Sequence, residues 1–302
     1  MKLNDTSTYE RLVRTKQDMP KTIFITGASS GIGKAVARQF AGQGWNVVAT
    51  LRDPSAETEL VNGDRLFVTR LDVQDESSVT SAVDAAVERF GGIDVLVNNA
   101  GFSLFGVFEA LSPHKIQEQF AVNVFGLMDV TRAVLPVLRR QGGGTIVNVS
   151  SSGGMITVPL MSMYHATKFA VEGFSESLAY ELTSQNIFVR LIEPGAVRTQ
   201  FGARMFSEFA HDRSLACYDR FIDKTNALFA AMLGGETSSA EQVADVVFDA
   251  ATDQSSRLRY VVGEDIAALV KARHEMGEDN YIALMRARFL SAEPAAPTAG
   301  GR

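Results

Sequence analysis

The stretch Tyr-His-Ala-Thr-Lys at residues 164–168 combines residue types and spacing that suit proton transfer. Tyr164 and Lys168 lie four residues apart in Ser162–Thr183, a predicted helix, so both side chains share one helix face. A phenol with a pKa of about 10 exchanges protons poorly at neutral pH, and an ammonium one turn away lowers that pKa. The pair therefore suits proton exchange with the oxygen of a ketone or alcohol. By itself this spacing is common, and it usually marks a solvent-facing tyrosine beside a lysine.

Further polar residues accompany this pair near the ends of predicted strands. Three consecutive serines, Ser150–Ser152, follow the apolar strand predicted over Thr145–Val149, and their hydroxyls could polarise a bound carbonyl. The run Asn98–Gly101 ends another strand, at the edge where parallel sheets bind ligands. Asn123 lies inside an apolar helical stretch, Phe120–Gly126, where an amide is unfavourable unless it has a task. That task is either chemical or a purely structural hydrogen bond, and the sequence leaves both open.

A glycine-rich turn lies between the first predicted strand, Thr22–Thr26, and the helical pattern that follows it. Its glycines are Gly27, Gly31 and Gly33. A pyrophosphate must approach the backbone amides and the helix N-terminus closely, and a β-carbon at these positions would obstruct it. As the first strand-to-helix turn of a parallel sheet, the segment predicts dinucleotide binding; the alternative is a glycine-rich turn without a ligand.

The end of the second predicted strand indicates which dinucleotide is bound. Binders of NAD place a carboxylate about 20 residues after the turn, on the ribose 2′-hydroxyl. Here Leu51 takes that position and Arg52 follows, and a guanidinium can hold a 2′-phosphate bidentately. NADP is therefore predicted, although Asp53 could turn toward the ribose and Arg52 could be an ordinary solvated charge. Other polar residues that could assist are Ser29, Ser30 and Lys34.

Strand and helix patterns alternate through most of the chain. The predicted strands are Thr22–Thr26, Val47–Leu51, Leu66–Leu71, Val95–Asn98, Thr145–Val149, Phe188–Ile192 and Tyr260–Val262. Such alternation predicts an α/β fold with a doubly wound, Rossmann-like parallel sheet and helices on both faces. We expect an N-terminal extension over residues 1–20, a single domain over 21–290 with an apolar substrate lid at about 200–233, and a disordered tail over 291–302. The last predicted helix runs from Ile266 to Leu290.

Composition excludes several classes of function. The net charge is −6 and the pI about 5.4, so binding to nucleic acid is not expected. Four scattered histidines and the single Cys217 argue against a zinc site and a disulfide framework, and no metal is predicted. The start of the chain is polar, and no window approaches eighteen apolar residues, so we expect no membrane span and a cytoplasmic protein.

Together these motifs resemble the short-chain dehydrogenase/reductase superfamily in its single-domain form. The resemblance covers about residues 20–265 and rests on the glycine turn, Asn98–Gly101, Asn123, the serines, Tyr164 with Lys168, and Pro194-Gly195, all in family order. The stretches Phe102–Ser112 and Tyr164–Leu182 look most like the branch related to 17β-hydroxysteroid and retinol dehydrogenases. The resemblance implies hydride transfer between a nicotinamide and a carbonyl or secondary alcohol. It also implies a homodimer or homotetramer formed through the two long helices.

The resemblance also implies residue roles. Tyr164 is the expected general acid/base, and Lys168 lowers its pKa and binds the nicotinamide ribose. Ser151, thirteen residues before the tyrosine, orients the substrate oxygen, and Asn123 holds a water in a relay with Lys168. The predicted cofactor contacts are Gly27, Ser29, Ser30, Gly31, Ile32, Gly33, Arg52, Asp72, Val73, Asn99, Ala100, Gly101, Tyr164, Lys168, Pro194, Gly195, Val197 and Thr199.

The segment after Thr199 departs from the strand–helix rhythm and contains many large apolar residues. Phe201 and Met205 are predicted to belong to a lid over the substrate, because methionine and phenylalanine adapt to irregular apolar ligands. Phe105, Met155 and Met161 are predicted to line the remaining wall, beside Ser151 and Tyr164. These residues predict a medium-to-large apolar ketone, aldehyde or secondary alcohol as the substrate. The alternative is that they pack in the core or in a subunit interface.

Two other functions compete with this prediction. An epimerase or dehydratase acting on nucleotide sugars uses a related turn, but with a glycine spacing unlike that of Gly27, Gly31 and Gly33, and usually a larger C-terminal domain. A non-catalytic NADP-binding sensor would keep the fold and lose the chemistry. Such proteins typically lack the tyrosine or the lysine, whereas all four catalytic positions are present in this chain.

Overall fold

The computed structural model describes residues 20–201, 209–210, 212–233 and 237–290. Within them, seven parallel strands form one sheet in the order β3-β2-β1-β4-β5-β6-β9. The strands are β1 (Thr22–Ile25), β2 (Asn46–Leu51), β3 (Leu66–Arg70), β4 (Val95–Asn98), β5 (Gly144–Val149), β6 (Ile187–Pro194) and β9 (Arg259–Val262). Two short strands, β7 (Val197–Arg198) and β8 (Ser238–Ser239), pair beside the sheet. The doubly wound parallel sheet predicted from the alternation is confirmed.

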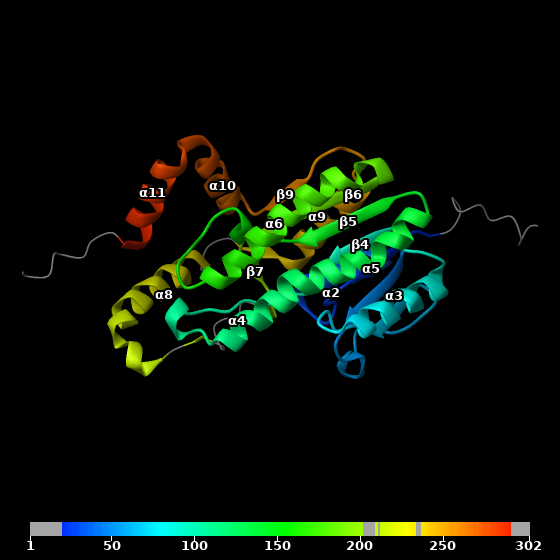
Figure 1. The fold of residues 1–302 in the computed structure, drawn as a ribbon, viewed down its shortest axis with the longest axis horizontal. Helices are drawn as coiled ribbons and strands as arrows, with labels where there is room; N and C mark the ends of the chain where they lie inside the picture. Colours follow the sequence, from blue (N-terminus) through cyan, green and yellow to red (C-terminus); the bar gives the residue numbers. More distant parts are fainter. Residues whose placement is uncertain (1–19, 202–208, 211, 234–236, 291–302) are drawn as a thin grey trace, which may run out of the picture.

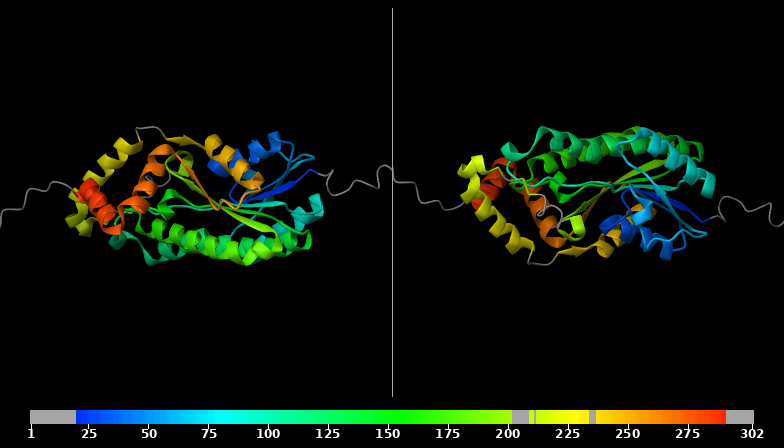
Figure 2. Two further views of the ribbon diagram at one scale, coloured as in Figure 1. Left: turned by 90° about the horizontal axis from the view of Figure 1, so that it is seen from above. Right: turned by 90° about the horizontal axis from the view of Figure 1, so that it is seen from below.

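Helices cover both faces of this sheet (Figure 2). The long ones are α2 (Gly31–Gly42), α3 (Glu76–Phe90), α4 (Pro113–Phe120), α5 (Leu127–Arg140), α6 (Ser162–Leu182), α8 (Asp219–Leu233), α9 (Ala240–Thr252), α10 (Glu264–Met276) and α11 (Glu278–Leu290). The short turns are η2 (Pro54–Ala56), η3 (Phe108–Ala110), η4 (Ala121–Gly126), η5 (Ser152–Gly154), η6 (Thr183–Gln185) and η7 (Arg213–Tyr218). Helices α2 and α9 share one core cluster with the sheet, whereas α3, α5 and α6 share the other.

Both faces of the central strands are buried, which explains their continuous apolar sequences. In β1, Ile23 and Ile25 pack toward α2 and α9, whereas Phe24 between them packs toward α3 and α5. All three side chains have no exposed surface. A strand sandwiched in this way needs apolar residues at successive positions, and β-branched side chains suit it.

One continuous helical stretch, Pro113–Arg140, joins α4, the π-helical turn η4 and α5. It is the single helix, among the residues described, that is long and apolar enough by length and composition to cross a membrane. Half of its apolar window is buried inside the fold, where Val130, Val134 and Leu138 pack against the sheet. Its apolar character is therefore accounted for by packing in the core of the domain.

The C-terminal helices differ from the sequence prediction. The helix expected over Ile266–Leu290 is wrong in one respect: it is two helices, α10 and α11, separated at Gly277. Gly277 has a φ of 77°, a left-handed conformation that glycine adopts readily and that ends α10. Because the chain turns there, α11 folds back, and α8, α10 and α11 gather beyond one end of the sheet (Figure 1).

Three expected features lie outside the described residues. They are residues 1–19 of the predicted N-terminal extension, the predicted tail over 291–302, and Met205.

Candidate active site

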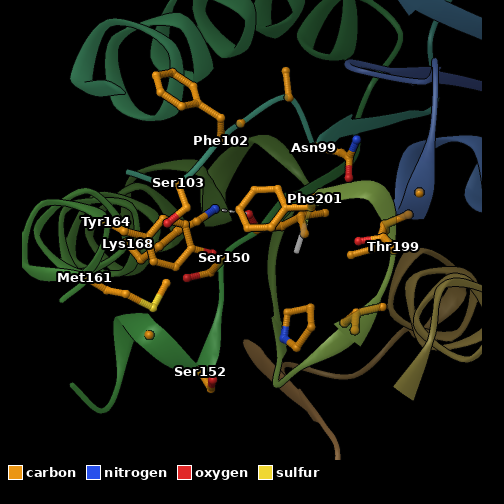
Figure 3. A pocket seen from close by; sticks show the side chains of 18 of the residues that line it. Asn99, Phe102, Ser103, Ser150, Ser152, Met161, Tyr164, Lys168, Thr199 and Phe201 are labelled. Atoms are coloured by element: carbon orange, nitrogen blue, oxygen red, sulfur yellow. Dashed lines mark hydrogen bonds between the residues drawn. The ribbon is translucent and has the colours of Figure 1, made fainter. Parts of the chain in front are cut away.

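A cavity of about 560 Å³ runs past the ends of the strands, between the sheet and the C-terminal helices. The order of strands reverses at β1 and β4, which is where doubly wound sheets bind ligands. The predicted residues that line it are Gly27, Ser29, Ser30, Gly31, Ile32, Arg52, Asp72, Val73, Asn99, Ala100, Gly101, Met161, Tyr164, Lys168, Pro194, Gly195, Val197, Thr199 and Phe201. In Figure 3, Tyr164 and Lys168 lie on one side, Asn99 and Thr199 on the other, and the ring of Phe201 between them.

The glycine turn needs its glycines because other backbone lies against it. A β-carbon on Gly33 would lie 2.4 Å from the carbonyl oxygen of Gly27, and one on Gly27, whose φ is 68°, would lie 2.9 Å from Ala100 Cα. The Asn99 amide fastens the turn by donating to the carbonyls of Thr26 and Gly27, each at 3.0 Å. Gly33 itself does not line the cavity; it permits the close packing that shapes the turn.

The N-terminus of α2 opens into the same cavity. Its N-cap residue, Ser30, makes no side-chain hydrogen bond to the helix, and the first turn carries no acidic residue. The first amides of the helix are therefore available to an anion, and the helix dipole favours negative charge there. This end of the cavity fits the pyrophosphate of a dinucleotide.

Side chains at the end of β2 show which of Arg52 and Asp53 faces the cavity. Leu51 is buried, whereas Arg52 is exposed and lines the cavity. Asp53 does not turn toward it, because its Oδ1 accepts hydrogen bonds from the Ser55 amide at 3.0 Å and the Ser55 hydroxyl at 2.6 Å. Lys34 forms ion pairs with two glutamates. Its Nζ lies 3.1 Å from Glu57 and 2.9 Å from Glu59.

Tyr164 and Lys168 are both buried in the cavity wall. Lys168 Nζ donates a 2.9 Å hydrogen bond to the carbonyl oxygen of Val149 and lies 5.7 Å from the centre of the Tyr164 ring. The Ser151 hydroxyl is close enough to the Tyr164 phenol to lower its pKa. Ser151 is half-buried and, unlike its neighbours Ser150 and Ser152, does not line the cavity; its Oγ accepts from the Gly153 amide at 3.0 Å, which caps η5. The end of β5 and one face of α6 thus meet at Tyr164.

Burial shifts the pKa values of this pair in opposite directions. It raises the pKa of Tyr164 to about 12, against a smaller lowering by the Ser151 hydroxyl. It lowers the pKa of Lys168 to about 8, against a raising contribution from the carboxylate of Glu172. The lowering of the Tyr164 pKa by Lys168 that the sequence predicted is not found: burial dominates the shift, and the Ser151 hydroxyl is the group that opposes it.

Asn123 uses its side chain within the protein. Its Oδ1 accepts from the Phe102 amide at 3.0 Å, and its Nδ2 donates to the Phe102 carbonyl at 2.8 Å and to Thr167 Oγ1 at 3.2 Å. These bonds tie η4 to the loop after β4 and to α6. Asn123 is buried and its side chain does not line the cavity, so its structural task is accounted for, and its role in a water relay stays a prediction.

The substrate end of the cavity differs in part from the predicted one. Phe105 does not line the cavity; it is buried behind the wall, with ring centres 5.2 Å from Phe209 and 5.6 Å from Phe229. The core-packing alternative therefore describes Phe105. Met155 lies beside the cavity without lining it, and its carbonyl accepts a 2.7 Å hydrogen bond from Arg273.

Most of the wall at this end was not predicted from the sequence. The residues concerned are Ile156, Ile266, Leu269, Met285, Arg288 and Phe289, whereas Phe229 belongs to the segment predicted as the lid. Spacing such as that of Met285 and Phe289 marks one helix face. It carries no information about what that face covers.

Comparisons with known proteins agree with this arrangement. A family model described as short chain dehydrogenase matches residues 21–209. An uncharacterised oxidoreductase of Schizosaccharomyces pombe is 36% identical over 236 residues, which are 78% of this chain and 98% of the relative. The chain belongs to the short-chain dehydrogenase family.

Other relatives in this family have more specific names. Retinol dehydrogenase 8 of Bos taurus is 42% identical over 200 residues, covering 63% of this chain and 64% of that protein. A short-chain dehydrogenase of Streptomyces avermitilis superposes with a TM-score of 0.75 at 31% identity, over 88% of this chain and 97% of the other. A short-chain dehydrogenase/reductase of Burkholderia phymatum in complex with NAD superposes with a TM-score of 0.73 at 28% identity, over 92% and 98%.

The predicted resemblance is confirmed by this family membership, and the protein is an NAD(P)-dependent oxidoreductase of the short-chain dehydrogenase family. Solved relatives include complexes with NAD and with NADP, so the family by itself does not decide between the two cofactors.

Proposed function

We propose that this short-chain dehydrogenase uses NADPH to reduce a medium-to-large apolar ketone or aldehyde, or NADP to oxidise the corresponding secondary alcohol, with Tyr164 as general acid/base. The observation that carries the proposal is the position of the Tyr164 hydroxyl. Tyr164 lines the cavity beside Lys168, with the glycine turn and the N-terminus of α2 at one end of that cavity and apolar side chains at the other.

The residues at this junction divide the chemistry among them. The cofactor, when bound, supplies or accepts the hydride. Ser151 and Tyr164 hold the substrate oxygen by hydrogen bonds, and the high pKa of the buried Tyr164 keeps its phenol protonated at neutral pH, ready to donate. Lys168 orients the ribose and places a positive charge beside Tyr164. Burial excludes water that would otherwise compete for the carbonyl oxygen.

The preference for NADPH rests on the end of β2. Arg52 lies at the cavity beside the buried Leu51, and Asp53 is held by Ser55, so a 2′-phosphate meets a guanidinium and no free carboxylate from that turn. Arg52→Ala is expected to raise the KM for NADPH about tenfold and to leave that for NADH unchanged. NADH kinetics of the same variant serve as the internal control. An equal effect on both cofactors would contradict the assignment.

The preference for apolar substrates rests on the wall opposite the glycine turn. Phe201, Met161, Phe229, Met285 and Phe289 line it. Such a surface favours hydrocarbon, with Ser151 and Tyr164 fixing the orientation of the single reacting oxygen. One relative in the family is named retinol dehydrogenase 8, and that name is consistent with an apolar substrate.

We also propose a homodimer or homotetramer in the cytoplasm. Three large apolar side chains on the two long helices are exposed in the single chain: Phe125 at 57%, Phe169 at 38% and Tyr180 at 72%. Burying them against a second copy would remove this apolar surface from water. Light scattering at micromolar concentration tests the assembly, and a monomer would reject it.

The experiment that tests the activity follows absorbance at 340 nm with NADPH or NADH over a panel of ketones and aldehydes graded by size. Wild-type protein is compared with Tyr164→Phe, which keeps the ring and removes the hydroxyl. Turnover with NADPH that increases with apolar size and disappears in the variant supports the proposal. Cofactor binding without turnover of any substrate in the panel would instead favour a non-catalytic sensor.

A further inference from the structure

A second group of charged side chains lies near Lys168 and does not line the cavity. Glu172 follows Lys168 by one turn of α6, and Glu193 lies near the end of β6, just before Pro194 and Gly195 of the cavity wall. Glu172 is 5% exposed and Glu193 is fully buried. Two buried carboxyl groups that touch neither substrate nor cofactor require a physical reason, because ionised carboxylates are costly to remove from water.

Arg259 of β9 is the cation that approaches both carboxyl groups. Its Nε lies 3.1 Å from Glu172 Oε2 and 3.4 Å from Glu193 Oε1, while its Nη2 lies 2.6 Å from Glu176 Oε2. Glu176 is on the same helix one turn further along and is much more exposed. Arg259 is thus shared among three carboxyl groups, and its Nε and Nη2 donate hydrogen bonds to Glu172 and Glu176.

The remaining charged groups near the pair are few. Helix α6 contributes Lys168, Glu172 and Glu176, β6 contributes Glu193, and Arg257 approaches from the segment before β9. The turn η5 packs closely against Glu172, since a β-carbon on Gly154 would lie 2.8 Å from Glu172 Cγ. This turn contributes no charged side chain. The ion pairs to Glu172, Glu176 and Glu193 all come from Arg259, so a single guanidinium serves three carboxyl groups.

Hydrogen bonding points to Glu193 as the group that carries the proton. Neither of its oxygens, nor Glu172 Oε1, receives a well-formed hydrogen bond from a donor among the described residues. The two carboxyl groups converge on one nitrogen, since Arg259 Nε lies 3.1 Å from Glu172 Oε2 and 3.4 Å from Glu193 Oε1. Burial together with the charge of Glu172 raises the pKa of Glu193 to about 8. A proton on Glu193 that is donated to Glu172 satisfies both groups at once.

We propose that Glu193 and Glu172 share one proton at neutral pH and act as positioning residues for Lys168. Ionised Glu172 keeps Lys168 cationic beside Tyr164, and protonated Glu193 holds Glu172 in place without adding a second charge. The connection is direct, because Glu172 is the carboxylate whose charge opposes the loss of the Lys168 proton on burial. This inference rests on the proposed role of Lys168, but its first test does not.

The first test detects the shared proton without any turnover. Infrared spectra of the folded protein at pH 7 are expected to contain the carbonyl band of a protonated carboxylic acid, which disappears in Glu193→Gln. Glu176→Gln is the matched control, since it removes a carboxylate bound to the same Arg259 and is expected to leave the band intact. Identical spectra for wild type and Glu193→Gln would overturn the proposal. Because the infrared comparison requires no turnover, it tests the shared proton even if no substrate has been found.

The second test measures the effect on Lys168 through the pH dependence of kcat/KM for ketone reduction. In Glu172→Gln, Lys168 loses its counter-charge, so the alkaline limb is expected to move to lower pH by about one unit. Glu176→Gln again serves as the control and is expected to keep the wild-type limb. Equal limbs in all three proteins, with only thermal stability changed, would show that Glu172 is merely structural.

Variants at position 193 separate proton donation from packing. Glu193→Gln retains a donor toward Glu172 and is expected to keep the limb in its wild-type position, whereas Glu193→Leu removes the donor and displaces it. The same limb in both variants would contradict the role given to the shared proton. If Glu172→Gln does not fold, this pair and the infrared comparison decide the matter. Absence of turnover in wild type with an intact infrared band would refute the proposed function alone.

Discussion

The two ends of the active-site cavity are built in different ways. At the cofactor end, the contacts come from short segments that directly follow strands: the glycine turn after β1, Arg52 after β2, and Asn99 after β4. At the substrate end, they come from the faces of α8, α10 and α11, which are far along the chain from the strands they cover. Tyr164 and Lys168 of α6 line the same cavity, across it from Asn99 and Thr199 (Figure 3).

This difference separates backbone recognition from side-chain recognition. A phosphate is bound by amides and a helix terminus, so the cofactor end tolerates little change in backbone shape. An apolar substrate is bound by adaptable surface, so the substrate end can change its side chains while the fold remains. Substitutions are therefore expected to damage folding or cofactor binding at one end and to retune substrate preference at the other.

The largest effect is expected at the junction. Tyr164→Phe removes the proton donor and should lower kcat by about three orders of magnitude while leaving the Kd for NADPH within about twofold. Stopped-flow turnover and fluorescence titration of NADPH measure the two quantities. A comparable loss of NADPH affinity would mean that the tyrosine belongs to the cofactor end and not to the junction.

At the cofactor end, Gly33→Ala is expected to destabilise the fold by about 1–3 kcal/mol and to weaken NADPH binding more than tenfold. The reason is that its β-carbon would meet the Gly27 carbonyl oxygen at 2.4 Å. Gly42→Ala, at the other end of the same helix, is the control, since nothing lies within 4 Å of that β-carbon. Thermal unfolding with and without NADPH measures both. Equal melting temperatures for the two variants would remove the argument for backbone crowding.

At the substrate end, Phe201→Ala is expected to raise the KM for a bulky apolar ketone about three- to tenfold and to leave NADPH affinity unchanged. The ring lines the cavity 6.0 Å from that of Tyr164, and it is 39% exposed, so its loss removes substrate contact and little core packing. Phe108→Ala, an exposed phenylalanine that does not line this cavity, is the control. An equal rise in KM for a small ketone would argue against apolar selection.

The smallest effect concerns the carboxyl pair, which belongs to neither end. The pKa of Glu193 is raised from its usual 4.5 to about 8, so the folded protein keeps a proton that the unfolded chain has released. This contribution to stability is complete below pH 4.5 and is lost as pH rises through about 8. Between pH 6 and pH 9 the melting temperature of wild type should therefore fall about five degrees more than that of Glu193→Gln. Parallel curves would contradict the raised pKa.

Most of the sheet and the cofactor end could be predicted from sequence because their signals are local. The strand expected over Val95–Asn98 has those bounds in the structure, and the strand expected over Val47–Leu51 begins one residue earlier. An apolar run, a glycine turn and a helix pattern lie within about fifteen residues of one another, and parallel strands bring their ends to one edge. The placement of Gly27, Arg52 and Asn99 in one cavity followed from that geometry.

The substrate end could not be predicted in the same way. Phe105 has the same residue type as Phe201, yet it is buried behind the wall while Phe201 lines the cavity. Which of the two faces the cavity depends on packing against distant residues: Phe105 is covered by Phe209 and by Phe229 of α8. The break at Gly277 likewise turned one expected helix into two, and its second half supplies Met285 and Phe289 to the wall.

The sequence by itself determined the family, the doubly wound sheet, the glycine turn and the spacing of Tyr164 and Lys168, because each depends on residues close together in the chain. Only the tertiary structure decided which apolar side chains form the substrate wall. It also decided that the Asn123 amide donates hydrogen bonds to Phe102 and Thr167, and that Glu193 and Glu172 come close together near Lys168. Those contacts join segments far apart in sequence. The burial that sets their pKa values and exposure exists only once the helices have packed on the sheet.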